Sequence, residues 1–532
     1  SPCSCLCFFD LVLVSFFRTI LRDMAVLEAE GVRQRGAKGP AEPQEPKKEE
    51  EKAAAPAGTW KGRSKSLAAI FCLWAFAPFL VSLAVFSWVR HKLFGGTFEK
   101  GTSAQKKALR ILVTGGKMSK ASAVARAVGR DGHTVFTAEI MPYKFCHTRF
   151  CTYVSKHYVL PRPTQQPKEW EATIQAIVKE QNIDLIIPCT APVESTAYAH
   201  LKERLPAHVR VFAFDGATSD TLDDKFTFNQ VLVNSGLPCP ETAHMTCLSD
   251  ALKFFEGREA SLEGMNLESQ KVANEANVVQ KAEGKKFIVK PAVYDPKART
   301  EILFLPIADQ ARQLEYLKSR NATKEVPYVI QEVLQEPEYG CYAFYNKGYL
   351  TGFELFESAA SCLVYSQLQK QYKEVKELCK GLGKSMNLTG QLTLDLMHKS
   401  TGELVPIECN PRIHSAVCTL EGHRNLASAL ADPDWRPSDA DIVTSSPDTF
   451  RFWVMDQIFL MAGFWKPKNC FKLSVGQMLK GGDALLSGDD PMPFLAMYLI
   501  QIPSLLLLEV LSGTEWLKID FCIGKIVKEG GD

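Results

Sequence analysis

The chain has 532 residues, with 62 Lys and Arg against 60 Asp and Glu, so its formal net charge is +2. Hydrophobic residues make up 46% and charged residues 23%, which is typical of a folded protein. The near-neutral charge argues against a dedicated nucleic-acid-binding protein, because such proteins usually carry a strong basic excess. The 16 cysteines form no CxxC pair and no Cys/His set at zinc spacing, which indicates mostly buried thiols in a reducing compartment.

Residues 1–65 are expected to be a disordered tail or a targeting region. Residue 1 is Ser, and Met24 is a candidate initiator. From about residue 28 onward this part of the chain is rich in Glu, Lys, Ala, Pro and Gly. It lacks the apolar residues that would offset the entropy cost of ordering the backbone, so no packed domain is expected there.

A membrane segment is predicted over residues 66–92. Leu67–Val89 contains 23 residues without a charge, which is long enough to cross a hydrocarbon core of about 30 Å. Basic residues flank both ends, so the charge pattern leaves the orientation open. Three alternatives fit the pattern: a spanning helix, a re-entrant hairpin bent at Pro78, and a buried core helix.

Apolar runs and helical patterns alternate over residues 105–220. The first apolar run is Ala108–Val113, and helical patterns follow at about Lys168–Glu180 and Val193–Arg204. Strands that alternate with helices indicate a parallel sheet with right-handed crossovers. This part of the chain is therefore expected to be an open-sheet α/β unit.

The pattern changes over residues 221–432. Helices are expected at Asp223–Ser235 and Gln367–Met386, and closely spaced strands around them indicate antiparallel pairing. Residues 433–532 are unusually apolar, with the charge-free stretch Phe494–Leu508. Because that stretch is short and contains Pro503, this region is expected to lie along a membrane surface or to pack on the core.

Two carboxylates and an amide stand on neighbouring predicted strands. Glu408 and Asn410 are two positions apart in one strand and so share a face. Asp395 precedes Glu408 by 13 positions, a spacing that suits a hairpin partner facing the same way. Such oxygen ligands suit Mg²⁺, and Arg412 offers a planar fork for phosphate oxygens. The alternative is an exposed hairpin with solvated acids, which is costly for Glu408 in an otherwise apolar strand.

Two lysines and one apolar strand are candidates for nucleotide contacts. Lys290 ends a buried strand from which it could reach a polyphosphate, and Lys225 opens a helix. Each lysine by itself could equally be a solvated charge. The segment 331–333 follows an apolar strand and could offer backbone groups to an adenine edge, with Glu338 near a ribose hydroxyl.

In their order along the chain, these motifs resemble the ATP-grasp superfamily over about residues 108–430. The resemblance implies a preATP-grasp α/β domain at 105–220 and an α+β ATP-grasp domain at 221–432. These domains would lie between the N-terminal membrane anchor and the apolar C-terminal extension that hydropathy predicts. It implies ATP and Mg²⁺ as cofactors, with Mn²⁺ as an alternative metal. The implied contacts are Lys225 and Lys290 to ATP phosphates, Gln331, Glu332 and Val333 to adenine, Glu338 to ribose, Asp395, Glu408 and Asn410 to the metal, and Arg412 to the transferred phosphate.

Within that superfamily the chain is most similar to the mycosporine-glycine synthetases. The likeness lies in Leu112–Met118, Asn410–Ala416 and Ile519–Lys525. Members of that family join glycine to 4-deoxygadusol at the expense of ATP. The resemblance therefore implies a C–N ligase with a small-molecule acceptor and an amino acid as partners, in which His414 and Ser415 face the second substrate. A hydrogen-bonded structural role for His414 fits the sequence as well.

One departure from the superfamily pattern leaves other functions open. Many ATP-grasp enzymes have a Gly-rich loop after the second lysine, whereas Pro291–Arg299 contains no Gly. Lys297 or Arg299 could supply side-chain charge in its place. The alternatives are a carboxylate–amine ligase that forms an acyl phosphate, and a membrane-anchored nucleotide-binding protein without turnover. The protein is expected to be membrane-associated, with its catalytic domain in an ATP-containing reducing compartment on the cytoplasmic or plastid side.

Overall fold

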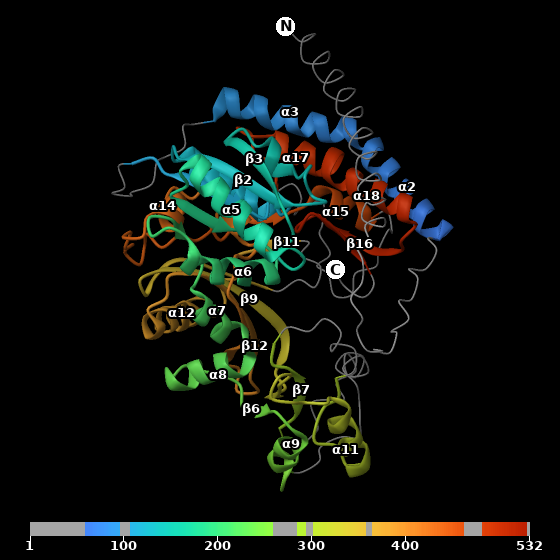
Figure 1. The fold of residues 1–532 in the computed structure, drawn as a ribbon, viewed down its shortest axis with the longest axis vertical. Coiled ribbons are helices and arrows are strands. Elements are labelled where there is room, and N and C mark those ends of the chain that lie inside the picture. The colour runs from blue at the N-terminus through green and yellow to red at the C-terminus, as the bar shows by residue number, and fades with distance from the viewer. Residues whose placement is uncertain are drawn as a thin grey trace, which may run out of the picture. The chain divides into compact units, whose positions relative to one another are not determined.

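The computed structural model describes residues 59–95, 107–258, 285–293, 302–357, 364–461 and 481–528 (Figure 1). All of these lie in the larger of the two units into which the chain divides, Ala57–Asp532. Most of the expected tail at 1–65 lies outside the described residues. So do Lys297 and Arg299, the candidate substitutes for a Gly-rich loop.

A five-stranded parallel sheet forms the first part of the fold, as the alternating pattern predicts. Its strand order is β3-β2-β1-β4-β5, so the order reverses between β1 and β4. The buried apolar runs form the strands, and amphipathic helices flank them. The elements are β1 (Arg110–Thr114), α4 (Ser119–Arg130), β2 (Thr134–Ile140), η1 (His147–Phe150), β3 (Val154–Leu160), α5 (Pro167–Gln181), β4 (Leu185–Pro188), α6 (Pro192–Leu201), η2 (Lys202–Arg204) and β5 (Arg210–Val211).

Two antiparallel sheets follow, in agreement with the predicted antiparallel pairing. One has the order β6-β8-β7 and the other β10-β9-β12-β13. The elements are α7 (Gly216–Asp223), α8 (Lys225–Asn234), β6 (Thr242–Met245), α9 (Leu248–Phe255), β7 (Phe287–Pro291), α11 (Gln310–Ser319), β8 (Tyr328–Glu332), β9 (Gln335–Asn346), β10 (Tyr349–Glu357), β11 (Val364–Ser366), α12 (Tyr372–Met386), β12 (Gly390–His398), β13 (Leu404–Asn410), α13 (Val417–Leu420) and α14 (Leu426–Ala431).

Two expected helix boundaries are wrong, each for a local reason. The helix expected at Asp223–Ser235 is broken at Asp224, whose side chain accepts from the backbone N–H groups of Phe226 and Thr227 and so caps a new helix, α8. The helix expected from Gln367 begins only at Tyr372, because Gln371 has a left-handed backbone with φ of 59°.

The C-terminal region packs on the first sheet. Its elements are β14 (Phe450–Phe452), α15 (Val454–Met461), β15 (Gly482–Asp483), α17 (Met492–Ala496), the π-helical turn η4 (Met497–Gln501), α18 (Ile502–Ser512), β16 (Trp516–Asp520) and β17 (Lys525–Lys528). The helical stretch Met492–Ser512 is long and apolar enough to cross a membrane, but 61% of it is buried inside the structure. Phe494, Tyr498 and Leu506 belong to the main hydrophobic core.

One buried arginine ties α4 to this region. Arg126 is fully buried and contacts the carboxylates of Asp490 at 2.9 Å and Glu421 at 3.1 Å. Its guanidinium also donates to the backbone oxygens of Leu485 and Asp490. Nearby, the Gln501 side chain donates to Lys117 O at 2.9 Å and accepts from His147. We refer to Arg126, Glu421 and Asp490 as the Arg126 cluster.

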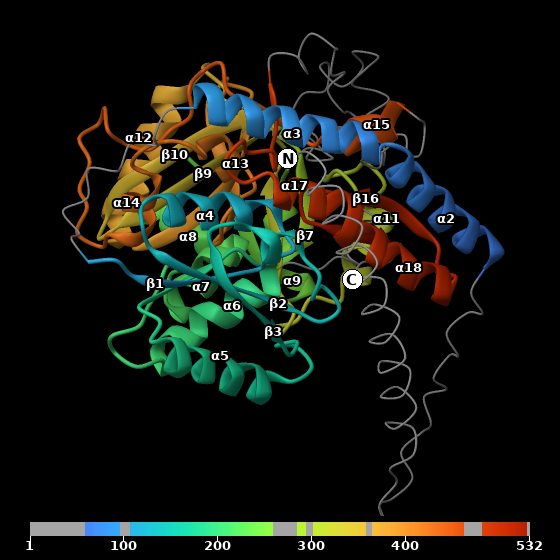
Figure 2. The ribbon, with the colours of Figure 1, turned by 90° about the horizontal axis from the view of Figure 1, so that it is seen from above.

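The predicted membrane segment forms two helices, α2 (Trp60–Ala75) and α3 (Ala77–Phe94), bent by 41° at Phe76. The expected bend point, Pro78, is wrong, because the chain bends at Phe76; a bend of 41° fits a broken span or a re-entrant loop. Pro78 lies in the first turn of α3, where proline lacks only an N–H that has no partner within the helix. α2 runs beside α18, and α3 runs beside α17, in both views (Figures 1 and 2).

Candidate active site

The β12–β13 hairpin brings the predicted metal ligands together on one face. Asp395 pairs directly with Glu408, and Thr393 pairs with Asn410, so all four side chains project to the same side of the sheet. The Asn410 Nδ2 donates to Asp395 Oδ2 at 3.1 Å. The residues that alternate with them, including Leu392, Leu394 and Leu396, are buried in the core on the other face. This period-2 alternation is what holds the polar face in register.

Lys225 reaches this face from the start of α8. Its Nζ lies 3.2 Å from Glu408 Oε2, and its backbone N donates to Ala292 O just beyond β7 at 2.9 Å. Asp224 fixes the position of Lys225 by capping the helix. The structure therefore brings a helix start and the end of β7 to the same hairpin.

Lys290, the fourth residue of β7, lies within electrostatic reach of the same carboxylates. Burial lowers the pKa of Lys290 to about 8, and the charge of Lys225 lowers it further. The negative charges of Glu408, Asp395 and Glu338 partly oppose this shift. Burial also raises the pKa of Asp395, and the Glu408 and Glu338 charges raise it further. We refer to Lys225, Lys290, Asp395, Glu408 and Asn410 as the hairpin cluster.

The hairpin cluster fits a divalent cation and phosphate. Two facing carboxylates are costly without a nearby cation, and carboxylate and amide oxygens are ligands that Mg²⁺ prefers. Across the parts of the chain that the structure describes, no group of three or more His, Cys, Asp or Glu could hold a metal ion. A metal here would therefore depend on Asn410 and phosphate oxygens besides the two acids.

The segment predicted to contact adenine is partly used within the sheet. Gln331 is buried, and its amide donates to Thr242 Oγ1 and Ile407 O, both at 3.4 Å. The Glu332 N–H donates a hydrogen bond to Glu241 O at 2.9 Å, and the Val333 N–H donates one to Lys286 O at 2.8 Å. These two N–H groups are therefore engaged within the protein, and the adenine contacts of Gln331, Glu332 and Val333 stay a prediction.

Arg412 and Glu338 lie near the cluster from two further directions. Arg412 Nη1 is 3.9 Å from Asp223 Oδ1 at the end of α7. Burial lowers the pKa of Arg412, while Asp223, Asp395 and Glu408 oppose that shift. Glu338 is exposed on β9, and its charge acts on both Lys290 and Asp395.

His414 and Ser415, the predicted second-substrate contacts, have structural surroundings. The His414 ring stacks on Phe356 at 4.7 Å and meets the edge of Tyr365 at 5.5 Å. Its Nδ1 accepts from the Ala416 N–H at 3.1 Å, and burial lowers its pKa to about 3, so the ring is neutral. Ser415 is buried, and its backbone oxygen accepts from the Cys418 N–H.

Sequence reasoning missed Lys120, which lies between the first sheet and the hairpin. This buried lysine in α4 donates to Ile413 O at 2.9 Å and to Thr190 O at 3.2 Å. Burial lowers its pKa to about 8, and the Arg412 charge adds to that shift. Lys120 follows β1, and Thr190 follows β4, at the place where the strand order reverses, which is where open α/β sheets bind ligands.

No family model matches the chain, and no curated protein matches it. The fold is similar to several solved structures. The biotin carboxylase domain of 2-oxoglutarate carboxylase from Hydrogenobacter thermophilus, solved with MgADP and bicarbonate, is 14% identical with a TM-score of 0.47, covering 63% of this chain and 73% of that chain. An L-amino acid ligase from Bacillus licheniformis is 14% identical with a TM-score of 0.41, covering 62% and 75%. The N5-carboxyaminoimidazole synthetase from Staphylococcus aureus, solved with ADP, is 15% identical with a TM-score of 0.41, covering 59% and 74%.

Proposed function

We propose that this chain is an ATP-dependent, ADP-forming ligase that makes a C–N bond. The hairpin cluster carries the proposal, because lysines from two separate elements meet two carboxylates and an amide on one sheet face. Cations for phosphate and oxygen ligands for Mg²⁺ are the two halves of a nucleotide–metal site. The ATP-grasp resemblance of the sequence motifs assigns the same residues to the same roles.

Each group has a defined task in this proposal. Lys225 and Lys290 bind and neutralise the ATP phosphates, and Arg412 stabilises the charge on the transferred phosphoryl group. Asp395, Glu408 and Asn410 would hold Mg²⁺, or Mn²⁺ as the alternative, which neutralises phosphate charge when bound. Glu338 would hold the ribose, and the strand end at 331–333 would line the adenine.

The reaction is a phosphoryl transfer followed by a displacement. An oxygen of the acceptor attacks the γ-phosphorus, and ADP leaves with the electrons of the broken P–O bond. An amine then forms the C–N bond as the C–O bond to phosphate breaks, releasing phosphate and a proton. The protein contributes positioning and charge stabilisation, and no enzyme side chain forms a covalent bond.

For the substrates we propose 4-deoxygadusol as acceptor and glycine as amine, on the resemblance to mycosporine-glycine synthetases. Lys120 supports an acceptor site next to Arg412, since it is a buried cation at the reversal point of the parallel sheet. A cation there would favour an acceptor that reacts through an anionic oxygen.

A product screen tests the proposal. Purified full-length protein is incubated with ATP, Mg²⁺, 4-deoxygadusol or a simple carboxylate, and a panel of amino acids, and products are read by mass spectrometry. We expect ADP and a condensation product that requires both acceptor and amine. A product only with carboxylates would instead favour the acyl-phosphate ligase. ATP binding without ADP release under any combination would favour the nucleotide-binding protein without turnover.

A further inference from the structure

The outer face of α2 and α3 is an exposed apolar surface. The large apolar side chains exposed along it include Trp60 at 78%, Phe71 at 75% and Phe86 at 67% exposure. The inner face of the same helices is different, because Leu73, Leu80 and Ala84 are buried in the main core. A helix that is apolar on all sides is stable only when all of it is removed from water. Among the described residues, the body of the protein covers the inner half of α2 and α3 and leaves the outer half exposed.

The inner contacts fix these helices against the body of the protein. Trp516 Nε1 donates to Ser66 Oγ at 2.9 Å, and the Thr59 N–H donates to Gly513 O at 2.8 Å. A Cβ added to Gly62 would lie 2.6 Å from Gly513 O, so the backbones approach closely. Rotating α2 away to span a bilayer would expose the buried apolar side chains and break these hydrogen bonds.

The tryptophans favour an orientation in the plane of a membrane. Trp60, Trp74 and Trp88 are all exposed and recur every 14 residues, so they lie along nearly the same side of the helices. Trp prefers the membrane–water interface. A spanning helix would place Trp74 at the centre of the bilayer, whereas a helix lying in the plane puts all three at the interface.

The charge of this segment points to an anionic surface. Thr59–Gly95 contains five Lys or Arg and no Asp or Glu. Glu515 offsets Lys61 through an ion pair of 3.0 Å. Arg90 and Lys92 are exposed at the other end. A second copy of this chain would present the same basic surface and be repelled, whereas anionic lipid headgroups would be attracted.

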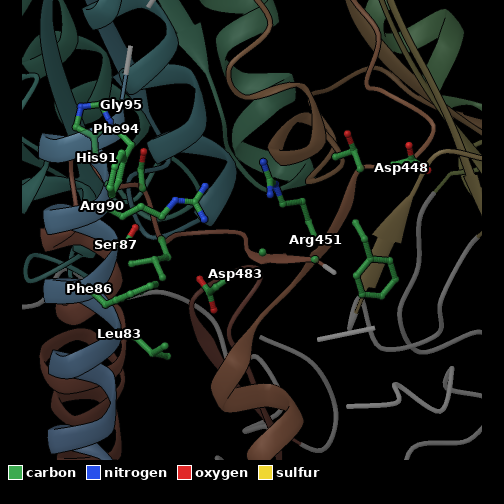
Figure 3. Close-up of a pocket in the computed structure, with 17 residues that line it drawn as sticks. Leu83, Phe86, Ser87, Arg90, His91, Phe94, Gly95, Asp448, Arg451 and Asp483 are labelled. Atoms are coloured by element: carbon green, nitrogen blue, oxygen red, sulfur yellow. The ribbon is translucent and has the colours of Figure 1, made fainter. Parts of the chain in front are cut away.

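A cavity of about 700 Å³ borders the basic end of α3 (Figure 3). Arg90 of α3 and Arg451 of β14 point toward one another across it, with Phe86 on the α3 wall. Asp448 and Asp483 also line the cavity, and the Asp483 carboxylate already accepts from Val454, Leu485 and Tyr498. Arg451 Nε donates to Cys418 O at 3.3 Å. Two guanidinium groups beside an apolar wall suit the phosphate of a lipid headgroup.

We propose that α2 and α3 dock the protein in the plane of an anionic membrane, on one side only, with a phospholipid headgroup in the cavity beside Arg90. The membrane covers the apolar outer face, and the exposed basic end of α3, with Arg90 and Lys92, selects anionic lipid. This proposal is independent of the ligase activity.

Vesicle flotation tests the docking surface. Full-length protein is floated with phosphatidylcholine vesicles with and without phosphatidylserine. We expect Phe71→Ser with Phe86→Ser to lower binding about tenfold or more, while Val233→Ser with Leu252→Ser, at exposed apolar positions on α8 and α9, leaves it unchanged. Arg90→Gln should lower the preference for phosphatidylserine, and Lys253→Gln should not. If each control variant lost as much vesicle binding or lipid preference as the matching α2 or α3 variant, the proposal would be overturned.

Sidedness separates docking from spanning. Full-length chain with a tag before Thr59 is produced in cells, and sealed vesicles are treated with protease from outside. Docking on one side leaves the tag and the domain after Gly95 on the same side, so both are digested or both protected. Protection of one with digestion of the other shows a spanning helix and overturns the proposal. A soluble protein that leaves no vesicle-bound fraction would overturn it as well.

Discussion

The Arg126 cluster and the half-buried hairpin cluster are both groups of mixed charge, but the pKa of Arg126 and the pKa of Lys290 shift in opposite directions. Burial by itself lowers the pKa of Arg126, yet Glu421 and Asp490 outweigh it, and the pKa is raised. In the hairpin cluster burial wins, and the pKa of Lys290 falls to about 8. The Arg126 guanidinium donates five hydrogen bonds, to the carboxylates of Asp490 and Glu421 and to the backbone oxygens of Leu485 and Asp490. These bonds hold α4 against segments that are distant in the sequence.

The opposite pKa shifts separate a charged cluster that stabilises the fold from one that suits a ligand. Where ion-pair partners outweigh the effect of burial, the charged form is favoured and the ion pairs hold the fold together. Arg126 does this between α4 and the C-terminal region. Where burial outweighs the partners, the charged forms of the side chains are disfavoured, and a bound ligand of opposite charge stabilises them. ATP and Mg²⁺ would supply both missing charges at the hairpin cluster.

The largest expected effect is on turnover. Asp395→Ala or Glu408→Ala should abolish ligase activity, with a loss of at least about 10³-fold, because the metal is no longer held. Initial rates of ADP release with acceptor and amine present measure it. Glu403→Gln, an exposed acid in the turn of the same hairpin, is the matched control and should keep normal rates. Normal ATP hydrolysis in either Ala variant would show that Asp395 and Glu408 do not hold a metal that the reaction needs.

The next effect is on stability at the Arg126 cluster. Arg126→Ala should lower the free energy of unfolding by about 3–5 kcal/mol, because Asp490 then remains buried without its cation, whereas Glu421 keeps Arg130 at 3.1 Å. Arg204→Ala removes the exposed pair with Glu171 and should cost about 0–1 kcal/mol. Urea unfolding of the three proteins gives both values. Similar costs for the two variants would show that Arg126 is not a structural lock.

A smaller effect is expected on nucleotide affinity. Lys290→Met should weaken ATP binding about 10–100-fold, since a hydrogen bond to a charged group contributes about 1.5–3 kcal/mol. Lys253→Met, on the exposed side of α9, should leave the affinity unchanged. Isothermal titration with ATP and Mg²⁺ measures both. Unchanged affinity in the Lys290 variant would place the phosphates elsewhere.

The smallest effect concerns a buried acid outside both clusters. Burial raises the pKa of Glu354 to about 7 from an ordinary value of 4.5, although Ser445 donates to both of its oxygens. Between these pH values the folded protein keeps a proton that the unfolded chain has released, so stability falls as pH rises through that window and levels off above it. Glu354 should contribute about 1–3 kcal/mol to this fall.

Urea unfolding at about pH 5 and about pH 8 tests this contribution. Glu354→Gln should flatten the fall in stability between the two pH values, because the neutral amide does not titrate. Glu403→Gln, at an exposed position, should retain the slope of the unchanged protein. An identical slope in all three proteins would show that Glu354 is ionised throughout.

Local patterns predicted the parts of the fold that depend on neighbours in sequence. The face shared by Asp395, Glu408 and Asn410 follows from period-2 alternation in one hairpin, and the structure places them so. The contacts of Lys120 with Ile413 and of Arg126 with Asp490 join positions 293 and 364 apart, and no local pattern encodes them. Likewise, an apolar run does not reveal that Leu73 faces protein while Phe71 is exposed, because both residues suit lipid equally.

The most direct test of the central claim is an experimental structure with a non-hydrolysable ATP analogue and Mn²⁺, read by anomalous scattering. We expect an anomalous peak in contact with Asp395, Glu408 and Asn410, and triphosphate oxygens beside Lys225 and Lys290. A bound nucleotide with its metal on other residues, or a hairpin cluster that stays closed on its own ion pairs at saturating ligand, would contradict the account.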